Sequence, residues 1–280
     1  MSVAERWRLR VSHETRFDYD GPARASYNEL RLTPRTERRQ TALETRVITV
    51  PPATQYGYVD YWGTHVVAFN VDRGHESLSI TGSSLVDTQP ATEPLDCSWS
   101  DVADAATTMA DHLSHNLYTA PRPDLISIAS ALRAPTPLAT ARRIIEWTQG
   151  ALRYVPGVTT VHTSANEAYV DGAGVCQDFA HLALSLAKSV GLPSRYVSGY
   201  FHPEADATVG EEVTGDTHAW LELWTGSWWG YDPTNDCAVG ERHVAVGRGR
   251  DYADVPPVKG IYAGNAEHAM RVTVRVTRTQ

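Results

Sequence analysis

The spacing of hydrophobic residues changes near residue 90, and this change constrains the possible folds of the chain more than any other feature. Between residues 7 and 19 the odd positions are mainly aromatic, aliphatic or small, and mostly charged residues alternate with them. A period of two residues is typical of a strand with one buried face. Comparable runs at 41–50, 65–72 and 77–86 are separated by proline or glycine. We therefore expect residues 1–95 to form a small antiparallel β domain.

Helical spacing follows the segment 89–94, which contains two prolines and is expected to be a linker. Apolar stripes within 102–113 and 144–152 predict two connecting helices. The proline-bearing stretch 121–137 is expected to interrupt the helical structure between these two helices. Residues 96–280 are therefore expected to form a second domain that mixes helices with strands, which makes the whole chain an α+β protein.

The best-defined helix is predicted directly behind Cys176. A capping-box pattern at 164–167 predicts a shorter helix before it, which should stop at Gly172. Apolar residues after the cysteine recur at helical spacing: Phe179, Leu182, Ala183, Leu186, Ala187 and Val190. Gly191 and Pro193 then stand where a helix usually ends. Cys176 is thus expected in the first turn, where unpaired N–H groups and the helix dipole favour a thiolate.

Two strands expected at 218–224 and 228–232 flank a three-residue loop with glycine at its centre. In an antiparallel pair with a loop of odd length, positions 218 and 232 project from the same face of the sheet. If position 224 lies opposite position 228, Asp232 is diagonal to His218 and within reach of its imidazole. A further strand is expected at 270–276.

Cys176, His218 and Asp232 supply the residue types of a nucleophilic thiol site. A thiol attacks a carbonyl as the thiolate, so it needs an imidazole to hold its proton and a fixed carboxylate to orient the imidazole. We therefore expect Cys176 as nucleophile, His218 as base and Asp232 as orienter. The backbone N–H of Cys176 is the expected oxyanion donor, and Gln177 and Gln149 are candidates for the second donor by residue type alone.

Other reactive side chains receive structural interpretations. Cys97 and Cys237 are interpreted as packing residues, and His181 as a hydrogen-bonded core residue. Asp178 is expected to cap its own helix through first-turn amides. One alternative stays open for Asp232, which precedes a proline and would then only start a turn.

Composition and charge argue against several classes of protein. The chain has 25 basic and 33 acidic residues, a formal charge of −8, which disfavours binding to nucleic acid or anionic lipid. No stretch approaches the ~20 apolar residues of a membrane helix, and the first residues lack a signal-peptide run. Three cysteines without a CxxC spacing form neither a disulfide framework nor a four-thiolate zinc site. We expect a cytoplasmic protein with no cofactor, no metal and no membrane or nucleic-acid partner.

The cysteine, histidine and aspartate segments resemble the bacterial transglutaminase-like superfamily, whose members have a papain-like core and commonly an N-terminal β domain. The resemblance covers almost the whole chain, through blocks at 28–34, 174–181, 195–200, 217–220, 232–235 and 250–257. Thr217 and Thr64 stand where serine and asparagine are usual, and neither belongs to the expected triad.

The resemblance implies a cysteine nucleophile at Cys176, a general base at His218 and an orienting carboxylate at Asp232. It also implies cysteine-dependent amide chemistry, either peptide or isopeptide hydrolysis or acyl transfer from a glutamine-type or peptide amide, through a thioester acyl-enzyme. The expected partners are a peptide or protein amide and, for transfer, a second amine; the sequence indicates no oligomeric state. Two alternatives remain: a non-catalytic peptide-binding scaffold, and a zinc hydrolase with Cys176, His218 and Asp232 as ligands.

Overall fold

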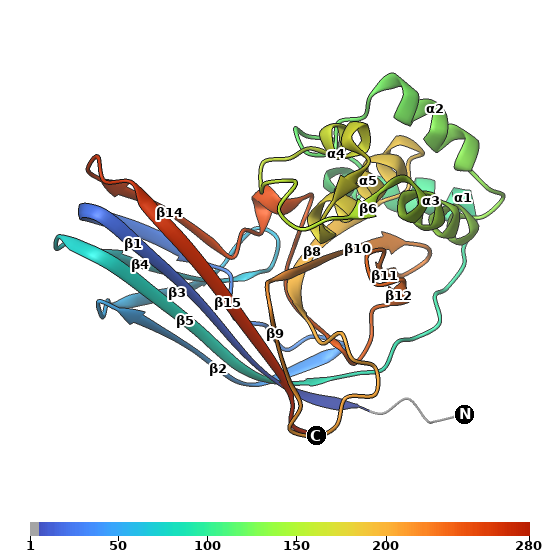
Figure 1. Ribbon diagram of the computed structural model, residues 1–280. Helices are drawn as coiled ribbons and strands as arrows, with labels where there is room; N and C mark the ends of the chain where they lie inside the picture. The colour runs from blue at the N-terminus through green and yellow to red at the C-terminus, as the bar shows by residue number, and fades with distance from the viewer. Residues whose placement is uncertain (1–5) are drawn as a thin grey trace.

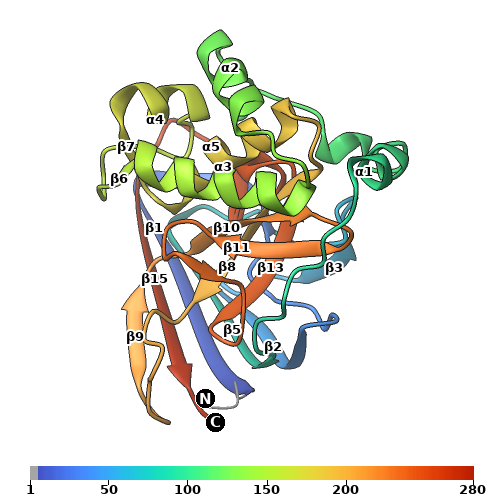
Figure 2. The same cartoon turned by 90° about the vertical axis from the view of Figure 1, so that its right-hand side faces the viewer.

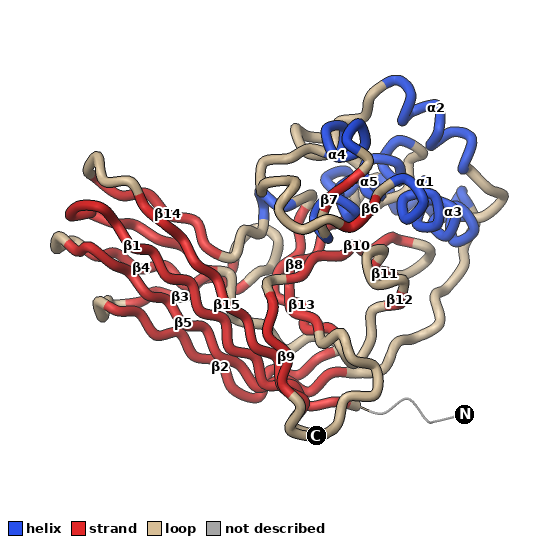
Figure 3. Tube along the Cα trace, in the orientation of Figure 1, coloured by secondary structure: helices blue, strands red, loops and turns tan. Residues whose placement is uncertain are grey.

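A computed structural model describes residues 6–280 and divides into a large β sheet, a smaller β sheet and a cap of helices (Figures 1 and 3). The large sheet contains β1 (Trp7–Leu30), β2 (Gln40–Val50), β3 (Gln55–Val59), β4 (His65–Val71), β5 (His75–Thr88), β9 (Glu212–Gly215), β14 (Val258–Ala263) and β15 (His268–Arg278). The strands expected at 41–50, 65–72 and 77–86 are therefore present, with ends shifted by a few residues.

Strand β1 organises the large sheet because it is long enough to have two sets of neighbours. Its first part pairs with β5 on one side and β15 on the other, and its last part pairs with β4 and β14. The pairing register shifts between Arg24 and Tyr27, and Ala25 there has a φ of 46°. Such a bulge bends the strand and increases its twist, so one strand contributes to both halves of the sheet.

The C-terminal strands lie in the sheet of the N-terminal domain. Strand β15 pairs with β1 from Leu9 opposite Arg278 to Tyr19 opposite His268, and β9 extends the sheet beyond β15. The expected boundary at residue 95 therefore does not separate the strands of the large sheet. The reason is that pairing between distant segments depends on the shared face they bury, which a local period does not reveal.

The smaller sheet has the strand order β12-β11-β10-β8-β13. Its strands are β8 (Ser194–Phe201), β10 (His218–Trp224), β11 (Trp228–Asp232), β12 (Cys237–Ala238) and β13 (His243–Gly249). Two very short strands, β6 (Arg153–Tyr154) and β7 (Ala173–Gly174), pair in parallel just before α5 (Cys176–Ser189).

Three layers place the smaller sheet at the centre of the molecule (Figure 2). On one face, Ala219, Leu221 and Leu223 of β10 pack with buried residues of α5. Residues at the other end of the sheet, including Val244 and Val246 of β13, pack with the large sheet in a second hydrophobic cluster. Packing on both faces holds β10 and β13 in place. These strands begin at His218 and His243 respectively.

The helices agree with the sequence in the core and differ from it in the proline-bearing stretch. They are α1 (Trp99–Ala106), α2 (Pro123–Leu132), α3 (Pro137–Ala151), α4 (Ala165–Asp171) and α5, with 3₁₀ turns at Ala110–His112 and Tyr252–Asp254. Helix α4 has the predicted capping box and ends at Gly172. Helix α2 was not expected, but its proline is at the first position, where the missing N–H costs nothing. Within residues 6–280, no helix is both long and apolar enough to cross a membrane.

Candidate active site

Cys176 is the first residue of α5, as the sequence predicts. The start of the helix is capped by Asp178, whose Oδ2 accepts a hydrogen bond from the backbone N–H of Val175 at 2.7 Å and another from the Thr159 hydroxyl at 2.6 Å. Asp178 therefore caps its own helix, but through the amide of the N-cap residue Val175 and not through the expected first-turn amides. A side chain at position 174 would bring a Cβ within 2.6 Å of Asp178, so Gly174 permits this close turn. The thiol is partly exposed at the positive end of the helix.

The hairpin that carries the other two residues has the predicted register. Trp224 lies opposite Trp228, and Leu221 lies opposite Tyr231. The loop between the strands turns at Gly226, whose φ of 103° favours glycine. His218 and Asp232 consequently project toward each other from the ends of β10 and β11.

His218 lies between the thiol and a buried carboxylate. Its Nε2 is 2.6 Å from Oδ2 of Asp232, whose side chain is fully buried. Cys176 lies close enough to the imidazole that hydrogen bonding and charge from its side chain help to raise the pKa of His218. The structure thus brings Cys176, His218 and Asp232 into one chain of side-chain contacts.

The electrostatics of the pair favour a charged imidazole. Burial alone would lower the pKa of His218, but the charge of Asp232 and hydrogen bonds to Asp232 and Cys176 outweigh it and raise the pKa to about 10. Burial would likewise raise the pKa of Asp232, yet His218 and a second histidine hold that pKa well below its usual range. The carboxylate is therefore ionised, and it stabilises an imidazolium beside the thiol.

Asp232 uses its two oxygens for two purposes. Its Oδ1 accepts hydrogen bonds from the backbone N–H groups of Thr234 and Asn235, at 3.0 and 3.2 Å. Its Oδ2 faces His218 and also accepts from the Asn235 side chain at 2.8 Å. The alternative in which this aspartate starts a turn is thus correct for one oxygen, while the other oxygen orients the imidazole.

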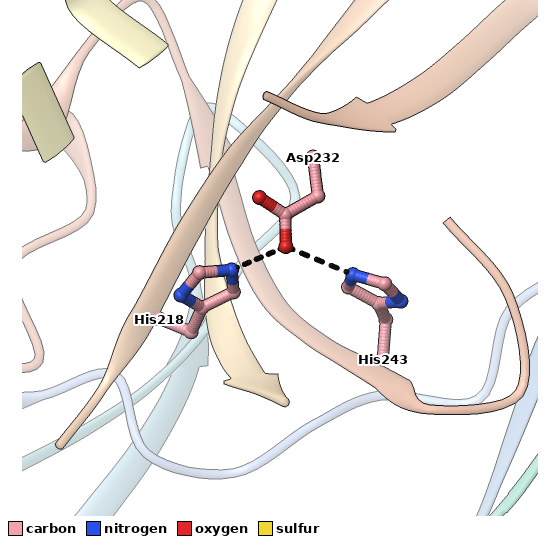
Figure 4. A group of neighbouring side chains, drawn as sticks. All are labelled: His218, Asp232 and His243. Carbon is pink, nitrogen blue, oxygen red and sulfur yellow. Dashed lines mark hydrogen bonds and ion pairs between the residues drawn. The ribbon is translucent and has the colours of Figure 1, made fainter. Parts of the chain in front are cut away.

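A second histidine reaches the same carboxylate and was missed from the sequence. His243, the first residue of β13, lies with its Nε2 3.4 Å from Oδ2 of Asp232 (Figure 4). The sequence pattern singled out His218 alone as the partner of Asp232. The contact joins residues on two strands that are not neighbours in the sheet, so no local spacing predicts it.

The two candidate oxyanion side chains make other contacts. The Gln177 amide donates to the backbone oxygen of Val161 at 3.2 Å, and the Gln149 amide donates to Pro233 O and to Asp236. Gln149 therefore holds the turn after Asp232. The backbone N–H groups at the start of α5 lack partners within the helix because of helix geometry, so they suit an oxyanion.

The structural interpretations of other residues agree with their surroundings. His181 is fully buried, its Nε2 accepts from the backbone N–H of Tyr252 at 3.2 Å, and burial lowers its pKa to about 3. Cys97 and Cys237 are free thiols. Burial, with a smaller contribution from Asp232, raises the pKa of Cys237 to about 11, so this thiol is protonated at neutral pH.

The same geometry bears on metal binding. Ligand atoms of His218, Asp232 and His243 lie within 4.8 Å of one another. The backbone N–H of Gly240 donates to Nδ1 of His243, so the Nε2 that faces Asp232 carries a hydrogen and has no free lone pair. The zinc alternative with Cys176 fits poorly too, because Nε2 of His218 and Oδ2 of Asp232 are hydrogen-bonded directly to each other at 2.6 Å and leave no space for an ion between them.

Comparisons with known proteins agree with this architecture. Residues 126–233 match the transglutaminase-like superfamily, and residues 9–87 match the bacterial transglutaminase-like N-terminal region. An uncharacterised protein of Mycobacterium leprae is 43% identical over 276 residues, covering 97% of this chain and 99% of that protein. An uncharacterised protein of Mycobacterium tuberculosis is 35% identical over 286 residues, covering 94% and 90%.

One solved structure shares nearly the whole fold. It comes from Cytophaga hutchinsonii, is described as a candidate cysteine protease, and superposes with a TM-score of 0.76. The match covers 96% of this chain and 90% of that chain at 22% sequence identity. At this identity the likeness establishes the fold, and the chemistry has to be argued from the site itself.

Proposed function

This chain belongs to the transglutaminase-like superfamily, and we propose that it performs cysteine-dependent amide chemistry at Cys176. One observation supports the proposal most directly. His218 interacts with the Cys176 side chain and is hydrogen-bonded through Nε2 to the buried Asp232 at 2.6 Å. A buried scaffold histidine has no need of a carboxylate that keeps it charged beside a partly exposed cysteine.

The proposed reaction has two steps. In the first, the Cys176 thiolate attacks the carbonyl carbon of an amide, His218 gives its proton to the departing amine, and a thioester forms on the sulfur. First-turn N–H groups of α5 would stabilise the oxyanion of the tetrahedral intermediate. In the second step, His218 takes a proton from water or from a second amine, which attacks the thioester and restores the thiol. Asp232 remains ionised and holds the imidazole in place throughout.

The proposed substrate is an amide of a peptide or protein, either a glutamine-type carboxamide or a peptide or isopeptide bond. We favour hydrolysis or a narrow peptide transfer over broad cross-linking, because no dedicated amine site is evident among the described residues. Cytoplasmic location is part of the same proposal. It is supported by three free cysteines, one of which has to stay reduced to react.

The test is to capture the acyl-enzyme on Cys176. The full chain is incubated at neutral pH with a mixture of peptides, quenched in acid, and digested for mass spectrometry of its three cysteine peptides. We expect hydroxylamine-sensitive adducts on the Cys176 peptide alone. Cys176→Ala should fold normally and show no adduct.

Cys237→Ala provides the matched control, because it removes a partly buried thiol near the same carboxylate. This variant should form adducts as the natural protein does. A Cys176 that reacts with iodoacetamide at neutral pH no faster than an unfolded peptide thiol would refute the proposed chemistry and favour a peptide-binding scaffold.

A further inference from the structure

Two histidines share one oxygen of Asp232, and only His218 contacts the thiol. His243 lies on the other side of the Asp232 carboxylate from His218, at 4% exposure, with Nε2 3.4 Å from Oδ2 (Figure 4). The proposed reaction assigns no step to His243. A nearly buried imidazole aimed at the orienting carboxylate nevertheless has a definable effect on it.

Hydrogen bonding determines the tautomer of His243. A backbone N–H can only donate, so the 3.3 Å contact from Gly240 N makes Nδ1 of His243 an acceptor. The other nitrogen, Nε2, therefore carries the hydrogen and donates it to Asp232. The ring has both nitrogens satisfied in its neutral form, and protonation would break the contact with Gly240.

The surroundings of His243 also favour the neutral form. The ring packs against Phe201, with centroids 4.5 Å apart, and edge-on against Trp220 at 5.1 Å. The charged and titratable groups that face it are Asp232, His218 and Arg242. Burial lowers the pKa of His243, and the positive charges of His218 and Arg242 lower it further, against the opposing effect of Asp232.

We propose that His243 is a positioning residue that donates a neutral hydrogen bond to Asp232 and thereby fixes the carboxylate on His218. This inference rests on the proposed function, because it assigns His243 a part in forming the thiolate–imidazolium pair. A neutral donor fixes the direction of Oδ2 without competing for its charge. A second cation at this position would neutralise Asp232 and weaken its effect on His218.

Two substitutions separate donation from packing. His243→Gln keeps an N–H donor near the position of Nε2, whereas His243→Phe keeps a ring between Phe201 and Trp220 and removes the donor. The measurement is the rate of Cys176 alkylation by iodoacetamide from pH 5 to 10. We expect His243→Phe to lower the rate at pH 6 by about tenfold and His243→Gln to recover most of it. Thermal unfolding of each variant establishes that it is folded.

Long-range ¹H–¹⁵N spectra of the imidazoles provide a reading that a purely structural role would not change. Near neutral pH, His243 should show the neutral Nε2–H form and His218 the charged form, and His243→Phe should lower the pH at which His218 loses its proton. A folded His243→Phe variant with the natural alkylation profile would overturn the inference, as would a charged His243. If Cys176 of the natural protein is itself unreactive, the proposed function fails. The spectra then still show whether His243 donates a neutral hydrogen bond to Asp232.

Discussion

The smaller sheet contains two buried carboxylates, and the protein surrounds them differently. Glu222 on β10 accepts hydrogen bonds from Arg195 at 2.6 Å and from Arg248 at 3.0 Å. Arg248 also binds Glu37 of the large-sheet domain at 2.7 Å. Asp232 on the neighbouring strand is bound instead by His218 and His243.

The difference lies in whether the partner can release its proton. An arginine is charged at every relevant pH, so the network around Glu222 is a permanent joint between the two domains. A histidine can hold or release its proton, so the contacts of Asp232 can follow a reaction at Cys176. The smaller sheet therefore has permanently charged arginines at Glu222, where it joins the two domains. It has titratable histidines at Asp232, where a reaction is proposed.

The largest effect is expected when the permanent joint is broken. Glu222→Gln removes the charge that Arg195 and Arg248 share in a buried site, and it should lower the free energy of unfolding by about 3–5 kcal/mol. Urea denaturation measures this loss, while Cys176 alkylation in the folded variant should stay within about twofold. Glu241→Gln, which removes a carboxylate outside this network, is the control. Equal losses in Glu222→Gln and Glu241→Gln would contradict the special structural role of the Glu222 network.

Glu222 and His218 should make stability depend on pH in opposite directions. Burial would raise the pKa of Glu222, but Arg248 and Arg195 lower it to about 2. Its contribution, about 3 kcal/mol, is thus present above the unfolded pKa of about 4.5 and is lost as the pH falls from there toward 2.

The raised pKa of His218, about 10, has the opposite sign. Its contribution is complete below about pH 6.5 and is lost as the pH rises from there toward 10. Stability curves of Glu222→Gln and His218→Gln, each subtracted from the natural curve, should differ on the acid and alkaline sides respectively. A Glu222 difference confined to the alkaline side would contradict the assignment.

A smaller effect is expected when Asp232, the carboxylate bound by the two histidines, loses its charge and keeps its shape. Asp232→Asn should lower the Cys176 alkylation rate at pH 6 by about tenfold, because the carboxamide no longer stabilises the imidazolium of His218. Asp236→Asn removes a carboxylate from the same turn without touching His218, and it should change the rate by less than about twofold. Equal alkylation rates in Asp232→Asn and Asp236→Asn would show that the contact between Asp232 and His218 does not affect Cys176.

Local sequence patterns predicted much of what positions the candidate site. Helix α5 could be predicted because its apolar spacing, its leading glycines and its end at Gly191 agree with one another. The facing of His218 and Asp232 could be predicted because hairpin parity depends only on loop length. The helix and the hairpin each depend only on residues that are close together in the chain.

The features that could not be predicted depend on distant contacts. The pairing of β15 with β1 joins opposite ends of the chain, and no residue in either strand specifies that partner. His243 reaches Asp232 across the sheet, because β8 and β10 separate β13 from β11. Helix α2 illustrates a different limit, since a proline before a helical run marks either a break or a helix start.

In the proposed site, Cys176 and His218 form a charged pair stabilised by Asp232. The most direct measurement is the pH profile of Cys176 alkylation in the natural protein and in His218→Ala. The natural protein should react at a nearly constant rate between pH 6 and 9, and His218→Ala should be about 100-fold slower at pH 6, with a rate that rises steeply toward pH 8.5 as for an ordinary thiol. Identical rising profiles in both proteins would show that Cys176 and His218 form no charged pair.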